Sequence, residues 1–337
     1  MIRFSILVPV YNVGARLARG LESVLAQTYA RWEVVCVDDG STDGSAATLD
    51  AYAERCPRIR VFHQENRGTL IARKEAVARA RGDWCLFLDP DDGLEPQALA
   101  RLAEIAAVTK AEVVSYGFNV RPEGPANGAA VKAAERYFNG ASGTFPVAEA
   151  YDRVFVSRRL PWNLIGKMVR TDVCKAAFAD QPAIYSIDAE DMYALFHILA
   201  RAATVEVVAD RLYDYSYGVG ISTKTDVTLA EWRRSLRKLD TLAELRDFRA
   251  KGGLPDAADR ALAHAAGRMI GSLFVKLATR MPSGESRRTA WRELRNAVPE
   301  ADLVRALALC YERRPLALAH DLARQEGRDE TESGGCP

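Results

Sequence analysis

Short apolar runs alternate with stretches of helical periodicity along the first 118 residues of the chain. The apolar runs are rich in β-branched and aromatic residues, which predicts buried strands over residues 4–10, 32–37, 59–62, 84–88 and 112–118. Between them, apolar positions recur every three or four residues, which predicts helices over residues 17–25, 46–55, 70–80 and 96–107. Such an alternation specifies a mostly parallel sheet with right-handed crossovers, so an α/β fold is predicted.

Acidic side chains follow two of these predicted strands. Asp38 and Asp39 come after the second, and Asp89, Asp91 and Asp92 come after the fourth, which is apolar throughout and suits the centre of a sheet. Open α/β sheets bind ligands at the carboxyl ends of their parallel strands, so the two clusters can meet at one crevice. Neighbouring carboxylates repel each other, and Mg²⁺ or Mn²⁺ that bridges them to substrate phosphates would offset this repulsion. Helix capping and turn formation at the first cluster, and a solvated turn at the second, are the alternatives.

The chain after residue 118 is less regular. Residues 121–142 are rich in Gly, Ala and Pro and are predicted to form a loop or a poorly ordered insertion. A strand at 164–169 is predicted to return to the sheet, and another is predicted at 204–208. Residues 212–223 contain several tyrosines and glycines and are predicted to be loop-like.

One further helix is predicted over residues 186–200, where apolar positions have helical spacing. Asp188, Glu190 and Asp191 fall in its first turn, where the helix dipole favours negative charge. Stabilisation of the helix alone would account for these acidic residues, and a catalytic role is the alternative. His197 lies two turns inside the helix and is predicted to be a packing residue.

From about residue 227 the pattern is helical throughout. Amphipathic helices are predicted over residues 232–248, 256–281, 285–297, 300–313 and 315–324. The chain is therefore divided into an α/β domain at 1–225 (halves 1–118 and 119–225), a helical region at 226–325 and a polar tail at 326–337, which is predicted to be disordered.

Composition and charge narrow the class of protein only slightly. The 337 residues are 48% hydrophobic and 27% charged, with a net charge of +1, so no nucleic-acid partner is predicted. Six cysteines lack metal-binding spacing, which is consistent with a reducing compartment. No apolar run approaches the ~20 residues of a membrane span, and Met1 leads directly into a predicted strand. A cytoplasmic protein is expected, with peripheral contact to the inner face of a membrane and homo-oligomer formation left open.

Several short motifs in the first 92 residues follow one another in a characteristic order. They are 5–12 (SILVPVYN), 22–29 (ESVLAQTY), 32–43 (WEVVCVDDGSTD), 66–68 (NRG), 72–73 (AR), 82–83 (GD) and 86–92 (LFLDPDD). Together they resemble the nucleotide-sugar-binding half of family-2 glycosyltransferases, an inverting group with a GT-A fold. Weaker resemblance extends through positions 162–163, 167, 190–192 and 213–215 and ends near Ser222.

The resemblance implies a Rossmann-like, mostly parallel GT-A sheet, here followed by a C-terminal α-helical extension. It implies a hexosyltransferase-type enzyme that uses Mn²⁺ or Mg²⁺ and a nucleoside-diphosphate sugar, with UDP expected. The acceptor would be a hydroxyl of a glycan or lipid-linked glycan, in the biosynthesis of a surface polysaccharide or glycoconjugate. The family motif usually has Ser or Ala where this chain has Pro90, which lacks a backbone donor and restricts φ.

The resemblance also implies roles for residues at the strand ends. Pro9 and Tyr11 would shape the base and ribose site, and Asp39 would accept a hydrogen bond from the base. Arg73 would tether Asp89 or reach the diphosphate, with a solvated helical face as its alternative. The other positions expected in the nucleotide-sugar site are Val10, Asp38, Gly68 and Pro90.

The metal and the general base complete the expected site. Asp91 is predicted to be the principal metal ligand, and Asp89 is predicted to lie near the ribose or the metal. Asp191 is predicted to take the proton of the acceptor hydroxyl, with Glu190 as a supporting group. Two roles, an acceptor subsite or core packing, are open for Trp162, Lys167 and Tyr213–Tyr217.

An enzyme is the leading hypothesis, and a binding module is the main alternative. Such a module would retain affinity for a nucleotide sugar without turnover, and its helical region would recruit partners. Asp91 and Asp191 are both present, which favours the enzyme. A nucleotidyltransferase is disfavoured, because that class has a Gly-rich basic loop after its first strand and residues 9–13 (PVYNV) do not form one.

Overall fold

The computed structural model describes residues 1–123, 128–140, 142–186, 189–218, 227–282 and 284–311. It consists of two compact units. The first contains Met1–Thr223 together with Phe248–Ala261, and the second contains Lys224–Asp247 together with Leu262–Pro337. The boundary predicted at residue 225 lies outside the described residues, and the segment Phe248–Ala261 groups with the α/β unit.

Helices connect the first strands of the α/β unit as the apolar periodicity predicts. They are α1 (Leu17–Leu25), α2 (Ser45–Arg55), α3 (Thr69–Arg79) and α4 (Ala98–Val108), and a 3₁₀ helix, Gly14–Arg16, precedes α1. In α1 the buried positions Leu17, Leu21 and Val24 are spaced by four and three residues, so a single stripe of the helix faces the core.

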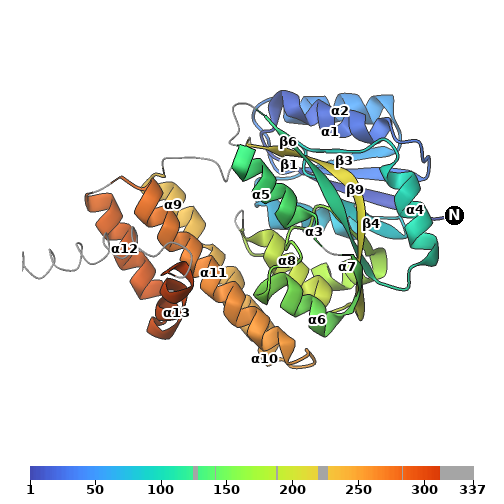
Figure 1. The fold of residues 1–337 in the computed structure, drawn as a ribbon. Coiled ribbons are helices and arrows are strands. Elements are labelled where there is room, and N and C mark those ends of the chain that lie inside the picture. Colours follow the sequence, from blue (N-terminus) through green and yellow to red (C-terminus); the bar gives the residue numbers. More distant parts are fainter. Residues whose placement is uncertain (124–127, 141, 187–188, 219–226, 283, 312–337) are drawn as a thin grey trace, which may run out of the picture. The chain divides into compact units, whose positions relative to one another are not determined.

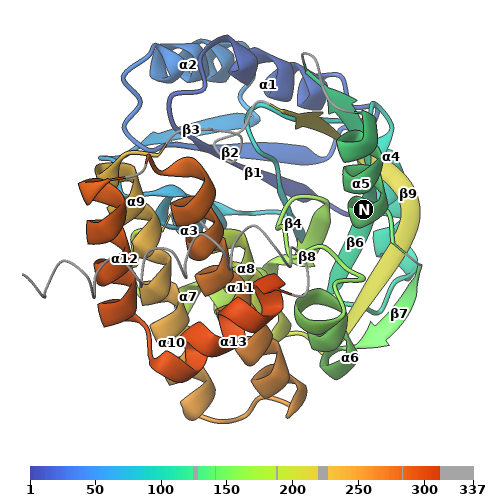
Figure 2. The same cartoon turned by 60° about the vertical axis from the view of Figure 1, so that its left-hand side comes forward.

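Four parallel strands form one half of the sheet, in the order β3-β2-β1-β4. They are β1 (Phe4–Val10), β2 (Trp32–Asp38), β3 (Ile59–His63) and β4 (Trp84–Phe87). Every residue of β1, β2 and β4 is buried, since helices cover both faces. Figures 1 and 2 show α1 and α2 on one face and α3 on the other. The carboxyl ends of β1, β2 and β4 therefore lie at the same edge.

The other half of the sheet is mixed. β8 (Lys167–Arg170) runs antiparallel between β4 and β6 (Val113–Pro122), and β9 (Thr204–Tyr217) runs parallel to β6. The short strands β5 (Gly93–Leu94) and β7 (Gly143–Pro146) pair antiparallel with β9. The predicted strand at 164–169 thus returns to the sheet, directly beside β4.

Two predictions for this half are wrong. Residues 121–142, predicted as a loop, contain the end of β6 and helix α5 (Gly128–Phe138). The prediction failed because the Gly- and Ala-rich composition concealed the few apolar positions, such as Phe138, that pack on the core. Residues 212–217, predicted as loop-like, belong to β9, whose tyrosines at every second position follow the period of a strand.

The remaining helices of this unit are short and well buried. They are α6 (Val147–Tyr151) with a π-helical turn at Asp152–Val156, α7 (Thr171–Ala179) and α8 (Glu190–Leu199). The helix predicted over residues 186–200 is confirmed as α8, which carries Glu190 and Asp191 in its first turn.

The C-terminal helices are α9 (Leu229–Leu236), α10 (Lys238–Ala250), α11 (Ala257–Arg280), α12 (Glu285–Ala297) and α13 (Glu300–Tyr311). The single helix predicted at 232–248 is two helices, divided at Arg237, and α9 begins with a capping box formed by Thr228 and Glu231. The predicted helix at 315–324 and tail at 326–337 lie outside the described residues. Each helix in the described ranges is too short or too polar to cross a bilayer.

Candidate functional site

The acidic pair that follows β2 is buried and organises its own surroundings. Asp38 accepts a hydrogen bond from the Ser41 backbone N–H at 3.0 Å and lies 2.9 Å from His63 Nδ1, and its hydrogen bond raises the pKa of His63. α2 begins only at Ser45, whose N–H donates to Asp43 Oδ1. The interpretation of Asp38 and Asp39 as a cap of this helix is therefore wrong.

Asp39 holds the loop that leads into α3. Its Oδ1 accepts hydrogen bonds from Gln64 Nε2 at 2.6 Å and from the Arg67 N–H at 2.9 Å, and its Oδ2 accepts one from the Gly68 N–H at 2.8 Å. Gly68 has φ of 90°, and a Cβ there would lie 3.2 Å from the Tyr185 ring. A side chain at position 68 would therefore be strained and crowded, which accounts for the glycine.

The acidic run that follows β4 forms a turn with different partners. The Asp92 N–H donates to the Asp89 carbonyl at 3.1 Å, so residues 89–92 turn back on themselves. Asp92 is buried, and its two carboxylate oxygens accept hydrogen bonds from Tyr213 Oη at 2.8 Å and from the Ser216 N–H at 2.7 Å. The interpretation of this run as a solvated turn is wrong for Asp92.

Arg73 joins this turn to α8. Its guanidinium is buried, with Nη2 at 3.1 Å from Asp89 Oδ1 and Nη1 at 3.6 Å from Glu190 Oε1, and Nη1 also donates to Asp191 Oδ1. The alternative that Arg73 lies on a solvated helical face is therefore wrong. The Arg73 guanidinium thus brings together three carboxylates, one after β4 and two at the start of α8. These two segments are more than 100 residues apart in sequence.

Negative charge is nevertheless in excess at the end of β4. Burial and the charges of Asp191 and Asp91 outweigh the attraction of Arg73 and raise the pKa of Asp89 to about 6. Burial and the neighbouring Asp89 also raise the pKa of Asp92. Such shifts mean that the site lacks positive charge, which a bound cation would supply.

The donor set fits a divalent cation that is held only in part by protein. No cluster of three or more His, Cys, Asp or Glu side chains suited to a metal occurs among the described residues. Both oxygens of Asp92 are engaged, whereas Asp89 and Asp91 are half-buried and Asp91 accepts only through its backbone carbonyl in the part of the chain that the structure describes. Two carboxylates, completed by phosphate oxygens and water, match the way Mg²⁺ is usually bound.

The predicted general base, Asp191, and its supporting residue, Glu190, lie at the start of α8. Glu190 and Asp191 have side chains that are 15% and 18% exposed, so both reach solvent. They follow Ala189, whose φ of 75° is unusual for a residue with a side chain. The ring of His197, deeper in the helix, is buried 4.8 Å from the Tyr193 ring and 4.2 Å from the Phe248 ring, as expected for a packing residue.

The residues that were predicted either to line an acceptor subsite or to pack in the core differ in their burial. Tyr213 is fully buried, so it cannot line an acceptor subsite. Lys167 is also buried; its Nζ donates to the Asn163 carbonyl, and burial lowers the pKa of Lys167 to about 7 against the opposing charge of Asp191. Trp162 is half-buried and stays a candidate for acceptor contact.

The end of β1 offers one exposed ring. Pro9 and Val10 are buried, whereas Tyr11 is 51% exposed at the same sheet edge as Asp38 and Asp89. The ring is accessible at that edge, and its contact with the base or ribose of a nucleotide stays a prediction.

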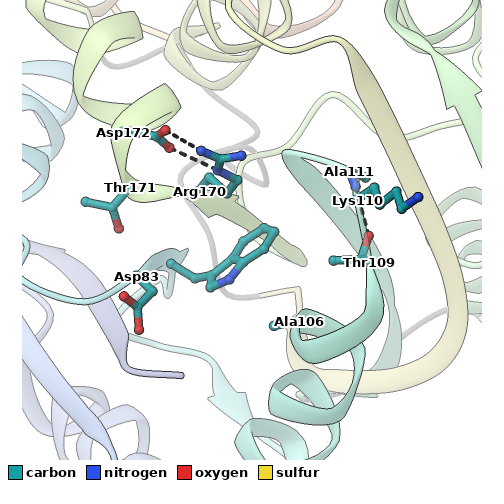
Figure 3. A pocket seen from close by; sticks show the side chains of 9 residues that line it. Asp83, Ala106, Thr109, Lys110, Ala111, Arg170, Thr171 and Asp172 are labelled. Atoms are coloured by element: carbon teal, nitrogen blue, oxygen red, sulfur yellow. Dashed lines mark hydrogen bonds and ion pairs between the residues drawn. The ribbon is translucent and has the colours of Figure 1, made fainter. Parts of the chain in front are cut away.

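Two cavities of the described structure lie away from these residues. A cavity of about 470 Å³, drawn in Figure 3, is lined by Asp83, Trp84, Ala106, Thr109, Lys110, Ala111, Arg170, Thr171 and Asp172. Trp84 is the first residue of β4, so this cavity opens at the edge of the sheet opposite to the acidic turn. A second, of about 200 Å³, lies around Ser115, Tyr116 and Asn139. Neither contains a predicted site residue, so the assignment of the site depends on the convergence of charged side chains rather than on cavity size.

Two supporting residues escaped the sequence analysis. Ser216 was not predicted to have any role, and Tyr213 was assigned only to a subsite or to the core, yet both contact the acidic turn. The alternating tyrosines at 213, 215 and 217 were the available signal, because they indicate a strand whose inward residues can reach a neighbouring loop.

Comparison with known proteins bears on the family and the fold of the chain. Residues 5–169 match the family model described as Glycosyl transferase family 2, and this part of the chain belongs to that family. The crystal structure of residues 1–349 of S. aureus TarS has a TM-score of 0.64 at 19% identity and covers 97% of this chain and 92% of that chain. The likeness confirms the GT-A fold, with helices after the α/β unit.

Curated relatives match only a segment of the chain. The uncharacterized glycosyltransferase EpsJ of Bacillus subtilis is 39% identical over 114 residues, which are 34% of this chain and 33% of EpsJ. Glycosyltransferase GlyG of Streptococcus pneumoniae is 37% identical over 111 residues, which are 33% of this chain and 37% of GlyG. The chain thus spans about a third of the length of the curated relatives that it matches.

Proposed function

We propose that this protein is a metal-dependent, inverting glycosyltransferase that moves a sugar from a nucleoside diphosphate to a hydroxyl acceptor. The observation that carries the proposal is the buried Arg73, which connects Asp89 at the end of β4 to Asp191 on α8. A carboxylate of the proposed donor site and a second, solvent-accessible carboxylate thereby contact different nitrogens of one guanidinium. Inverting sugar transfer needs one group that stabilises the leaving diphosphate and another that activates the hydroxyl. The diphosphate departs from one face of the anomeric carbon while the hydroxyl attacks the opposite face.

UDP is the nucleotide that the proposal favours. S. aureus TarS, which shares the fold, has been solved in complex with UDP and with UDP-GlcNAc. In this chain the exposed Tyr11 would contact the base or ribose. Within the described part of the chain, Asp39 Oδ2 accepts one hydrogen bond, from the Gly68 N–H, so a second lone pair can accept from a base N–H.

The cation would be held by Asp91 and Asp89, with phosphate oxygens and water as its other ligands. When bound, Mn²⁺ or Mg²⁺ stabilises the charge that develops on the departing diphosphate. The protein's own contribution is to hold the two carboxylates in a turn whose backbone is already hydrogen-bonded.

Asp191 would act as the general base. Its Oδ1 is engaged by Arg73, which fixes the orientation of the carboxylate and leaves Oδ2 for the acceptor hydroxyl. As the acceptor oxygen bonds to the anomeric carbon, its proton passes to Asp191 and the bond from that carbon to the diphosphate breaks, with inversion. Glu190, which lies 3.6 Å from Arg73, supports the orientation of the pair.

The acceptor that fits the proposal is a hydroxyl of a glycan or lipid-linked glycan in polysaccharide or glycoconjugate biosynthesis. One relative is described as a putative teichuronic acid biosynthesis glycosyltransferase of Bacillus subtilis, 38% identical over 101 residues. The half-buried Trp162 would contact a sugar face of this acceptor.

The proposal is tested with the full chain, UDP-GlcNAc and Mn²⁺, by following release of UDP with and without glycan acceptors. Asp191→Asn should bind UDP-GlcNAc normally but turn over at least about 100-fold more slowly, the usual scale for loss of a general base. Asp180→Asn removes an exposed carboxylate paired with Arg201 and serves as the control. An Asp191→Asn variant as active as wild type would reassign the base, and binding without turnover by wild type would favour the binding module.

A further inference from the structure

The turn formed by residues 89–92 is held from two sides by parts of the chain far from it in sequence. On one side lies β9, and on the other lies α1. Pro90 lacks an N–H and cannot contribute a backbone donor to the turn. The geometry of the carboxylates therefore depends on contacts from outside the turn.

On the β9 side, two residues make four hydrogen bonds to the turn. Tyr213 Oη accepts from the Asp89 N–H at 3.1 Å and donates to Asp92 Oδ2 at 2.8 Å. The Ser216 N–H donates to Asp92 Oδ1 at 2.7 Å, and Ser216 Oγ donates to the Asp91 carbonyl at 2.8 Å. The three acidic residues of the turn are thus each fixed by β9.

On the α1 side, the backbone of the turn packs closely against the helix. A Cβ at Gly20 would lie 3.0 Å from the Pro90 carbonyl oxygen and 3.2 Å from the Asp92 carbonyl oxygen. Ser23 Oγ accepts a hydrogen bond from the Leu94 N–H at 3.1 Å, just after the turn. The turn therefore cannot move toward α1 without a clash.

We propose that Tyr213 and Ser216 are positioning residues that set the affinity of the turn for a divalent cation and a nucleoside diphosphate. The inference rests on the proposed function, which assigns Asp89 and Asp91 to the cation. Tyr213 is fully buried and Ser216 is 3% exposed, so both act through the turn rather than by touching a ligand. Loss of either contact loosens the backbone that carries the Asp89 and Asp91 carboxylates, which weakens a site that demands close geometry.

The test compares two changes that each remove one buried hydroxyl from a tyrosine. Tyr213→Phe removes both hydrogen bonds of Oη, whereas Tyr116→Phe removes a buried hydroxyl that has no hydrogen-bond partner in the described structure. UDP affinity is measured by calorimetry with Mn²⁺ and with a chelator. With Mn²⁺ we expect Tyr213→Phe to bind UDP about tenfold more weakly than wild type, the usual scale for the loss of hydrogen bonds to a charged group. Tyr116→Phe should bind UDP as tightly as wild type.

The dependence on Mn²⁺ separates positioning from a general loss of structure. A positioning role predicts that Tyr213→Phe lowers affinity with Mn²⁺ but leaves the affinity measured with chelator unchanged. Equal loss in both conditions would overturn the inference, because it would indicate a structural role only. Ser216→Ala, which keeps the N–H bond to Asp92 and loses the bond to the Asp91 carbonyl, should give a smaller loss of the same kind.

Asp91→Ala distinguishes failure of the inference from failure of the proposed function. If Asp91→Ala loses Mn²⁺-dependent affinity and Tyr213→Phe does not, the positioning role is overturned and the metal assignment stands. If neither variant changes the affinity, the metal assignment is wrong and the inference falls with it. Gly20→Ala, which presses on the turn from the α1 side, should weaken binding as Tyr213→Phe does.

Discussion

The two acidic strand ends of this protein, at β2 and β4, are similar in sequence but differ in their hydrogen-bond partners and in their balance of charge. After β2, Asp38 and Asp39 accept hydrogen bonds from the backbone N–H groups of Ser41, Arg67 and Gly68, which lie in adjoining loops. After β4, the Tyr213 hydroxyl and the Ser216 N–H of β9 hold Asp92, the Arg73 side chain of α3 contacts Asp89, and burial raises the pKa of Asp89 to about 6. The first cluster shapes a loop, whereas the second retains unbalanced negative charge.

The difference shows how a chain can use carboxylates for two purposes at one sheet edge. A carboxylate that accepts backbone N–H bonds is already stabilised in its charged form and needs no cation. Carboxylates crowded together without enough donors are stabilised when a cation binds. The number of local donors, rather than the number of acidic residues, distinguishes the nucleoside side of the proposed site from its metal side.

The largest effect is expected from a change at the end of β4, where the two strand ends are proposed to differ in metal binding. Asp91→Ala should abolish Mn²⁺-dependent affinity for UDP, because it removes the carboxylate that the turn leaves for the cation. Asp38→Asn, the matched change at the β2 end, should retain the dependence on Mn²⁺. Calorimetry with and without a chelator measures both, and equal Mn²⁺ dependence in the two variants would contradict the distinction.

Removal of the positive charge of Arg73 should have the second largest effect, a loss of stability. Arg73→Met leaves Asp89, Glu190 and Asp191 without their shared partner in a partly buried site, which should destabilise the protein by about 3–5 kcal/mol. Chemical denaturation measures the loss. Arg55→Met removes an exposed arginine that pairs with Glu22 and should change the stability very little, because water screens an exposed ion pair. Similar stability of the two variants would mean that the Arg73 contacts contribute little.

The pH dependence of stability tests the environment of Lys167, beside Asp191. Its pKa of about 7 lies below the unfolded value, so the unfolded chain binds the proton more tightly and stability falls as the pH drops from about 10 toward 7. Lys167→Met should lack this component. The stability of this variant relative to wild type should rise by about 2–3 kcal/mol between pH 9 and pH 7 and change little below that. A difference that is independent of pH would show that Lys167 titrates normally.

The smallest effect is expected at the β2 end. Asp39→Asn keeps one acceptor oxygen and replaces the other with an NH₂ group, so either the Arg67 N–H on Oδ1 or the Gly68 N–H on Oδ2 loses its acceptor, and UDP affinity should fall by about tenfold. The ratio of affinities with and without Mn²⁺ should stay as in wild type. A change in that ratio would show that the two strand ends act as one metal site.

Local pattern was sufficient for most of the α/β half. The spacing of Leu17, Leu21 and Val24 predicts α1 correctly, and the apolar run before Asp89 predicts β4. Pattern failed at α5, where small residues conceal a helix, and at the end of β9, where aromatic residues suggested a loop. In both regions the element is stabilised by aromatic packing in the core, where the Phe138 and Tyr213 ring centroids lie 4.3 Å and 5.1 Å from that of Phe118.

Residue order alone determined that this chain forms alternating strands and helices and that carboxylates stand at two strand ends, since both depend on neighbours in sequence. Only the folded chain decided which of those carboxylates are neutralised. Arg73, Tyr213 and Ser216 reach the β4 turn from α3 and β9, and their distance from it depends on the pairing order of the sheet, which no local pattern encodes. Electrostatic environment is a property of three-dimensional proximity, and it separates a loop anchor from a cation site.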